Sequence, residues 1–347
     1  MPSPTISRTA EPPEDWQAFA VAHGTFYHRP EWAQCLANMY RLKVDYYSAR
    51  VTESLRGILA VAEIPPLLGP RRFVSLPFSY AAGPLATDAD TASALSRAVL
   101  ERARERNISR VEIKSRGEHQ APPGFQRVSR YTTYEIATEG GEAAVWKQLH
   151  PSSTQRGIKK GQKSGLVVRR GESADDWLLM AELEERTAHG HGLPAPPRRF
   201  FVEGCLRLQR AGLADVYIAF TSSGAPAAAI TVWKGTRSWI YGFGASDPSH
   251  LEHRPNHLLL WAAIQDAIVA GCRFDMGRAA PEQQGLIEFK RRWGGQPQPL
   301  AYDYWPAPAG LNLAQRDRGS MAAVAAVWSR LPAGIARLGS GLYRYLG

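Results

Sequence analysis

The order of strand-like and helix-like segments between residues 166 and 305 is the strongest constraint on the fold of this chain. Short runs rich in β-branched and aromatic residues, typical of strands, occur at 166–169, 216–220, 227–233, 239–244, 274–276 and 299–305. Apolar residues with helical spacing occur at 175–188, 198–210, 256–270 and 281–293. The order β-α-α-β-β-β-α-β-α-β therefore predicts an α/β fold built on a mixed sheet.

The first 140 residues carry a shorter version of the same order. Helical patterns lie at 29–40 and 91–106, and strand patterns lie at 46–51, 57–64, 72–76, 110–114 and 124–136. This order is that of an acetyltransferase-type (GNAT) fold, so we predict tandem GNAT-like domains that arose by internal duplication. Residues 1–14 are rich in proline, and we expect them to be loose.

Three units follow from this reading of the chain. We expect an N-terminal, degraded GNAT-like domain over 1–140 and a C-terminal catalytic domain over 141–308, entered by a basic helix at 142–163. Residues 309–347 form a tail in which Met321, Trp328, Ile335 and Leu342 recur every seven residues. Such spacing predicts an amphipathic helical tail, which either contacts a membrane or packs on the protein itself.

The net charge of +10 indicates anionic partners. Seven Lys or Arg and no acidic residue lie between Lys147 and Arg170. The three cysteines are far apart and match no disulfide framework or metal-ligand spacing. We see neither a secretory signal nor an apolar run of about 18 residues. We therefore expect a cytoplasmic protein without metal, with peripheral contact at the inner membrane as an alternative.

Several short motifs resemble the FemAB (FemABX) family of acyltransferases within the GNAT superfamily. They also resemble its subgroup associated with exopolysaccharide and PEP-CTERM protein-sorting systems. The motifs, in chain order, lie at 26–32 (FYHRPEW), 74–78 (VSLPF), 83–85 (GPL), 156–160 (RGIKK), 165–168 (GLVV), 274–278 (FDMGR), 289–294 (FKRRWG) and 328–332 (WSRLP).

The resemblance implies an enzyme that transfers an acyl or aminoacyl group to an amine. Founding members of the family take the group from aminoacyl-tRNA and act on peptidoglycan precursors. We therefore expect aminoacyl-tRNA or an acyl thioester such as acyl-CoA as donor, and no permanently bound cofactor. The expected acceptor is an amine of an anionic sugar-nucleotide or lipid-linked precursor of the cell envelope or of an exopolysaccharide.

Acyl transfer to an amine requires stabilisation of an oxyanion and removal of a proton. The family places the lysine of its Phe-Lys motif near the reacting carbonyl, which makes Lys290 our preferred catalytic residue. Asp275 is a weaker candidate for the proton acceptor. We expect the strands at 239–244 and 274–276 to part, leaving a groove with Lys290 at its lip.

Further residues are candidates for substrate binding. Gly242 and Gly244 would allow a substrate close to the backbone of the fourth strand. Arg278 could hold a phosphate or carboxylate, and Arg156 and Lys160 share one face of the basic helix. The remaining candidates are Tyr241, His191 and Trp293.

One absence bears on the donor. Between residues 246 and 260 there is no Gln/Arg-x-x-Gly-x-Gly turn, which normally holds the pyrophosphate of acetyl-CoA in this fold. This weakens, without excluding, the alternative of an acyl-CoA-dependent N-acetyltransferase acting on a small amine. A second alternative, from another class, is a non-catalytic adaptor that contacts the membrane through its tail.

Overall fold

A computed structural model describes residues 3–65, 71–117, 121–306, 328 and 339–345. Within these ranges 13 strands form a single sheet, in which β5 pairs with β3 beside the main row β1-β2-β3-β4-β6-β13-β7-β12-β11-β10-β9-β8. The strands are β1 (Thr5–Thr9), β2 (Lys43–Val51), β3 (Ser54–Ile64), β4 (Arg72–Val74), β5 (Leu85–Ala86), β6 (Arg110–Arg116), β7 (Gln126–Ile136), β8 (Val167–Gly171), β9 (Ala214–Phe220), β10 (Pro226–Lys234), β11 (Ser238–Ser246), β12 (Arg273–Ala279) and β13 (Gln296–Trp305).

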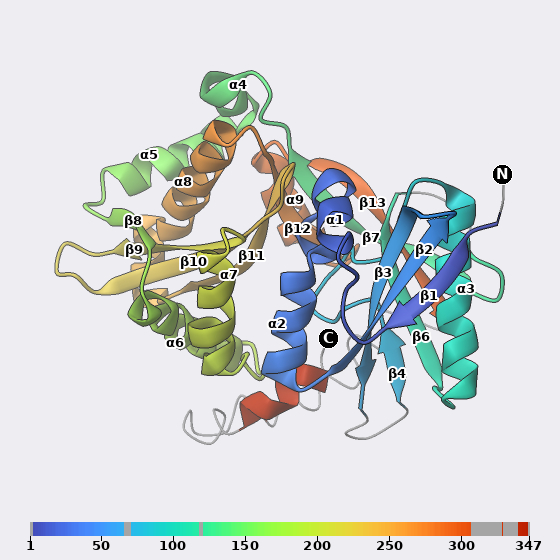
Figure 1. Cartoon of the computed structure of the whole chain (residues 1–347). Coiled ribbons are helices and arrows are strands. Elements are labelled where there is room, and N and C mark those ends of the chain that lie inside the picture. Colours follow the sequence, from blue (N-terminus) through green and yellow to red (C-terminus); the bar gives the residue numbers. More distant parts are fainter. Residues whose placement is uncertain (1–2, 66–70, 118–120, 307–327, 329–338, 346–347) are drawn as a thin grey trace.

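Helices cover both faces of this sheet (Figure 1). The α-helices are α1 (Trp16–His23), α2 (Pro30–Tyr40), α3 (Ala89–Glu105), α4 (Gly141–Gln148), α5 (Arg156–Gln162), α6 (Ala174–Gly190), α7 (Leu206–Arg210), α8 (Pro255–Val269) and α9 (Gln284–Arg292). Shorter 3-10 or π segments are η1 (Phe26–His28), η2 (Pro151–Gln155), η3 (Phe200–Cys205), η4 (Pro248–His253) and η5 (Gly339–Tyr345).

The sheet repeats one arrangement in its two halves. Each half contains one parallel pair, β4–β6 in the first and β11–β12 in the second, among antiparallel neighbours. The halves also exchange strands, because β13 lies between β6 and β7 while β7 pairs with β12. The last strand of the chain's second half, β13, therefore lies among strands of the first half. In turn β7, from the first half, pairs with β12 of the second half.

Three apolar cores follow from this arrangement. One lies between α3 and the first half of the sheet, and a second lies under α4, α5 and α8 in the second half. The third is shared, since it joins Trp16 and Trp32 of the first half to Phe200 and Trp233 of the second. The α2 helix runs between the halves in Figure 1, and its ring contacts reach both. The division at residue 140 remains a prediction, because the sheet and this core are continuous across it.

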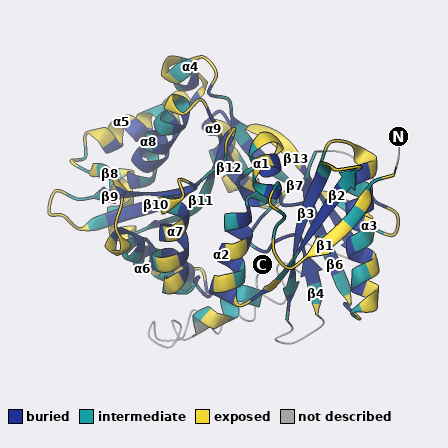
Figure 2. Ribbon diagram, in the orientation of Figure 1, coloured by how far each residue is buried: buried dark blue, intermediate teal, exposed yellow. Residues whose placement is uncertain are grey.

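Several element boundaries predicted from the sequence need correction. Residues 5–9 are not loose: they form β1, the mostly exposed edge strand seen in Figure 2. The basic helix expected at 142–163 is interrupted before Pro151, since proline lacks an amide hydrogen and disfavours a helical residue before it. The helix expected at 281–293 is α9, which begins at Gln284. The helix α1 was not predicted from the sequence.

The tail predicted at 309–347 lies mostly outside the described residues, so its heptad pattern is not tested. Of the described part, Trp328 is buried and η5 packs on the protein. The ring of Tyr343 stacks on Phe78 with centroids 4.7 Å apart, and Arg72 donates to the carbonyl of Tyr345 at 2.9 Å. Among the described segments, no helix has the length and apolarity needed to cross a bilayer.

Candidate functional site

The parallel strands β11 and β12 part after a short paired stretch. Residues Ser238, Trp239 and Ile240 pair with Arg273, Phe274 and Asp275, and no further pairs follow. The paired residues of β11 are buried, whereas the next four, 241–244, are half-buried. Exposure therefore begins where pairing ends, which confirms the expected parting of these strands.

Two glycines lie in residues 241–244 of β11, which form the open segment of this strand. A β-bulge opposite Ile230 and Val232 changes the register with β10 there. A Cβ at Gly242 would lie 2.5 Å from the Thr231 hydroxyl oxygen, so this glycine is required by packing. A Cβ at Gly244 would lie 1.7 Å from the hydroxyl oxygen of Tyr241, so the Tyr241 side chain extends over Gly244. Only Gly244 thus borders a movable side chain in the open segment.

On the facing strand, Asp275 holds a turn of the backbone. Its fully buried carboxylate accepts the backbone N–H of Gly277 at 2.8 Å, and it also accepts hydrogen bonds from Thr133 and Arg116. Gly277 has a φ of 78°, which favours glycine. Both oxygens of Asp275 are therefore engaged, and its surroundings suit a structural anchor better than the proton acceptor predicted from sequence.

Lys290 reaches this turn from α9. Its side chain is buried, and its ammonium donates to the carbonyls of Gly277 at 2.6 Å and of Arg278 at 2.8 Å. Burial lowers the pKa of Lys290 to about 8, while Asp275 opposes the shift. An ammonium has three N–H donors, so the two hydrogen bonds to β12 leave one N–H of Lys290 for another acceptor. These hydrogen bonds thus hold Lys290 beside the part of β12 that no longer pairs with β11.

Two other predicted residues lie close to Lys290 in the chain but differ in exposure. The exposed guanidinium of Arg278 lies over the ring of Tyr131, 4.3 Å from its centroid. Trp293 is fully buried and packs against His257 and Phe289, with centroids 5.8 and 6.1 Å away. Arg278 is therefore available to solvent, whereas Trp293 has no surface to offer a substrate.

The basic residues predicted to bind anions lie on the outside of α5. Arg156 and Lys160 are exposed, and neither forms an ion pair with another described residue. Between them in the helix, Gly157 meets His257 at the start of α8, where an added Cβ would lie 2.3 Å from the ring. The basic face is thus held close to the N-terminal turn of α8.

The remaining predicted residue, His191, is exposed and caps the C-terminus of α6. The segment before α8 is the 3-10 helix η4, in which the Asp247 side chain accepts the N–H of Ser249 at 3.0 Å. This segment takes the place of the glycine-rich phosphate turn whose absence the sequence showed. Apart from His191, the site residues predicted from sequence thus fall into two groups, one at or near the parting strands and one on α5.

Sequence reasoning missed three residues around the parting strands. Arg116 binds Asp275 from β6, and Tyr343 comes from the tail. The third is Glu184 on α6, a half-buried carboxylate whose pKa burial raises to about 8. Helical spacing could have revealed it, because Trp177, Ala181 and Ala188 on the same stripe are all buried.

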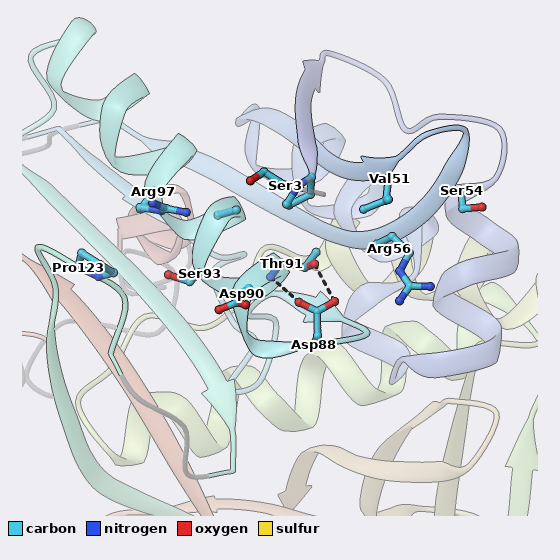
Figure 3. Close-up of a pocket in the computed structure, with 12 residues that line it drawn as sticks. Ser3, Val51, Ser54, Arg56, Asp88, Asp90, Thr91, Ser93, Arg97 and Pro123 are labelled. Atoms are coloured by element: carbon cyan, nitrogen blue, oxygen red, sulfur yellow. Dashed lines mark hydrogen bonds between the residues drawn. The ribbon is translucent and has the colours of Figure 1, made fainter. Parts of the chain in front are cut away.

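A separate pocket of about 820 Å³ lies in the first half, beside the N-terminus of α3. Figure 3 shows that the Asp88 carboxylate in this pocket binds Thr91, and the bond to the Thr91 N–H measures 2.8 Å. Asp88 is therefore used as a helix cap. The lining comes entirely from the first half, so this pocket is distinct from the parting of β11 and β12.

Comparison with known protein families finds a match in the second half of the chain. Residues 152–291, less than half of the chain, match the family described as "Acetyltransferase (GNAT) domain". The chain therefore contains a transferase domain of the GNAT type. No protein with curated annotation matches the sequence.

Solved structures resemble nearly the whole chain. FemX matches with a TM-score of 0.65 and 13% identity over 86% of this chain and 96% of its own. L-PGS from Bacillus licheniformis matches at 0.57 and 12%, over 93% and 98%. A tandem GNAT protein from the clavulanic acid biosynthesis pathway matches at 0.53 and 14%, over 86% and 98%. These similarities confirm the tandem GNAT-like fold predicted from the sequence.

Proposed function

We propose that this protein transfers an acyl or aminoacyl group to an amine, in the groove where β11 and β12 part. One observation carries the proposal: pairing of the two strands ends at Ile240 and Asp275, where residues 241–244 become accessible and Lys290 is fixed nearby. An open strand edge offers backbone groups that can hold an extended acyl or aminoacyl chain. The remaining N–H of Lys290 would stabilise the oxyanion of the tetrahedral intermediate.

The acceptor we propose is an amine on an anionic precursor of the cell envelope or of an exopolysaccharide. The motif resemblance to FemAB proteins and the structural similarity to FemX and L-PGS support this class. Exposed Arg156 and Lys160 would attract the phosphates of an aminoacyl-tRNA donor or of a diphosphate-linked acceptor. Peripheral contact with the inner membrane through the tail, and assignment to the exopolysaccharide subgroup, belong to the same proposal.

A second candidate is N-acylation of a small amine from acyl-CoA. The match of residues 152–291 to the acetyltransferase (GNAT) domain favours it. The 3-10 helix η4 in place of a glycine-rich turn argues against it, since it offers few free backbone N–H groups to a pyrophosphate. The identity of the acyl donor therefore distinguishes the two candidate functions.

Product analysis tests the proposal directly. The protein is incubated with pooled aminoacyl-tRNAs, with acyl-CoAs, and with amine-bearing envelope precursors in separate reactions, and products are identified by mass spectrometry. We expect an acceptor heavier by one acyl or aminoacyl group, with an amide linkage, and loss of that product with Lys290→Ala. Product formation only from acyl-CoA and a small amine would favour the second candidate, and no product from any pair would contradict both.

A further inference from the structure

The inward face of α6 carries one carboxylate among apolar side chains. Trp177 lies seven residues before Glu184, Ala181 lies three before it, and Ala188 lies four after it, so all four share one helical stripe. The apolar members are buried, and Glu184 is half-buried. A carboxylate on such a stripe is costly unless it is paired or protonated.

The carboxylate of Glu184 has no partner among the described residues, whereas its neighbours on α6 do. Glu185 accepts two hydrogen bonds of 2.8 Å from Arg198, which also lies 3.2 Å from Glu182. Arg186 pairs with Asp247 at 3.1 Å. The cations near Glu184 are therefore engaged elsewhere, and no ion pair explains its position.

Glu184 faces the open segment of β11. The α6 helix packs against β11. Burial raises the pKa of the Tyr241 and Tyr343 phenols, and the nearby charge of Glu184 raises it further. Tyr241 lies one residue past the last pair with β12, and Tyr343 comes from η5 of the tail. Among the described residues these phenols are the titratable groups from other elements that face Glu184, and no cation does.

We propose that Glu184 binds the protonated amine of the acceptor and removes its proton before acyl transfer. The proposal rests on the function proposed above and deepens it. An ammonium would supply the cation that Glu184 lacks, and the aromatic faces of Tyr241 and Tyr343 would favour a positive charge beside it. The acceptor is therefore a primary amine with a pKa high enough to be protonated at neutral pH.

The proton and electron balance is complete without another reactant. The ammonium gives one proton to the Glu184 carboxylate and becomes a neutral amine. The nitrogen lone pair forms the new C–N bond at the donor carbonyl, and the C–O or C–S bond to the donor then breaks. The second proton of the nitrogen goes to the leaving alkoxide or thiolate, which departs as an alcohol or thiol, and Glu184 releases its proton to water.

A carboxylate with a pKa near 8 suits this role, because it can hold the proton it takes and lose it again near neutral pH. An ordinary surface glutamate, with a pKa near 4.5, would be a much weaker base. Close approach of an ammonium would lower the pKa of Glu184, so binding of the acceptor would itself favour the ionised base.

The test is the pH dependence of amide formation at subsaturating acceptor, with the donor and acceptor that product analysis identifies. For the wild-type protein, we expect kcat/KM to rise with pH up to about 8. Glu184→Gln should lower kcat/KM by about 100-fold or more and abolish this rise. Glu182→Gln, on the same helix but paired with Arg198, is the matched control and should behave as wild type.

Binding supplies a second readout that does not depend on turnover. Calorimetry compares an acceptor amine with its N-acetylated form, which carries no charge. Wild type should prefer the amine and Glu184→Gln should lose that preference, with a cooperative melting transition showing that the variant is folded. An active wild type with an unaltered pH profile and unaltered amine preference in Glu184→Gln would overturn this inference alone, whereas an inactive wild type with every donor would overturn the proposed function.

Discussion

The ammonium of Lys290 donates a hydrogen bond of 2.6 Å to the carbonyl oxygen of Gly277, where β12 has left β11. Because Gly277 has a φ of 78°, the lysine fixes a left-handed turn of β12 beyond its last pair with β11. A second hydrogen bond goes to Arg278 at 2.8 Å. Lys290 therefore supports the backbone of β12, and it would also stabilise the oxyanion in the proposed reaction; the predictions below separate these two roles.

Lys290→Ala should lose both functions. Two carbonyls of β12 would lack their donor, which should lower the free energy of unfolding by about 2 kcal/mol. Amide formation should fall by about 100-fold or more, because the oxyanion loses a charged donor. Urea titration and initial rates check the two effects, with Lys43→Ala, at an exposed residue of β2, as the control. A folded Lys290→Ala protein with wild-type rates would remove this residue from the mechanism.

Asp275→Asn should destabilise the protein because Arg116, whose side chain is only 27% exposed, would lose one of two anionic partners and keep Glu135, at 3.5 Å. We expect a loss of about 3 kcal/mol in the free energy of unfolding. A double-mutant cycle with Arg116→Met measures the coupling between the two residues. Additive losses would show that the contact contributes nothing to stability, contrary to our description of Asp275 as an anchor.

Glu184 should make stability depend on pH with a defined sign. The unfolded carboxyl ionises near pH 4.5, while the folded carboxyl keeps its proton until about pH 8. The unfolded state therefore binds fewer protons between these values, so stability falls as pH rises through that window. Glu184→Gln should be more stable than wild type by about 4 kcal/mol at pH 8 and similar to it at pH 4.5. Thermal melts at both pH values check this, and equal differences at both would contradict the raised pKa.

The tail should influence Glu184 through Tyr343. Tyr343→Ala removes a ring that faces Glu184 and stacks on Phe78, so water should reach the carboxylate and lower its pKa. The rise of kcat/KM with pH should then shift to lower pH. Tyr345→Ala, at a residue whose backbone rather than ring binds Arg72, is the control. An unchanged pH dependence of kcat/KM in Tyr343→Ala would show that Tyr343 does not shield Glu184 from water.

The basic face of α5 should act on the affinity for an anionic substrate rather than on the chemical step. Lys160→Glu should raise KM for the polyanionic donor or acceptor with little change in kcat, and it should weaken the dependence of KM on salt. Arg97→Glu on α3, in the other half of the sheet, keeps the same charge change and serves as the control. Equal effects of both variants would indicate a general charge effect rather than a binding face.

Much of the fold was predictable because its signals are local. Apolar periodicity and turn residues set the order of elements from 166 to 305, and the capping box that Ser173 and Asp176 form at the start of α6 is also a short-range pattern. The exchange of β7 and β13 was not predictable, because strand pairing depends on partners far apart in the chain. Edge strand β1 was missed for the same reason.

The site residues likewise differ in whether local sequence signals or contacts between distant residues determine them. Lys290 was found through a motif resemblance, and its position at the parting strands agrees with that expectation. The partners of Asp275 could not be predicted from the sequence, since Arg116 lies 159 residues from Asp275 in the chain. Glu184 was visible as a charged residue on an apolar stripe, yet its lack of a partner depends on how Arg186 and Arg198 are paired in three dimensions.

The rate of amide formation by Gly244→Ala measures most directly whether the open segment of β11 is the reaction site. The new methyl group would displace the Tyr241 hydroxyl, a flexible side-chain end, so the fold should persist. We predict a rate at least about 10-fold below wild type, with Gly285→Ala on an open face of α9 unaffected. Wild-type rates in a folded Gly244→Ala protein would contradict the account.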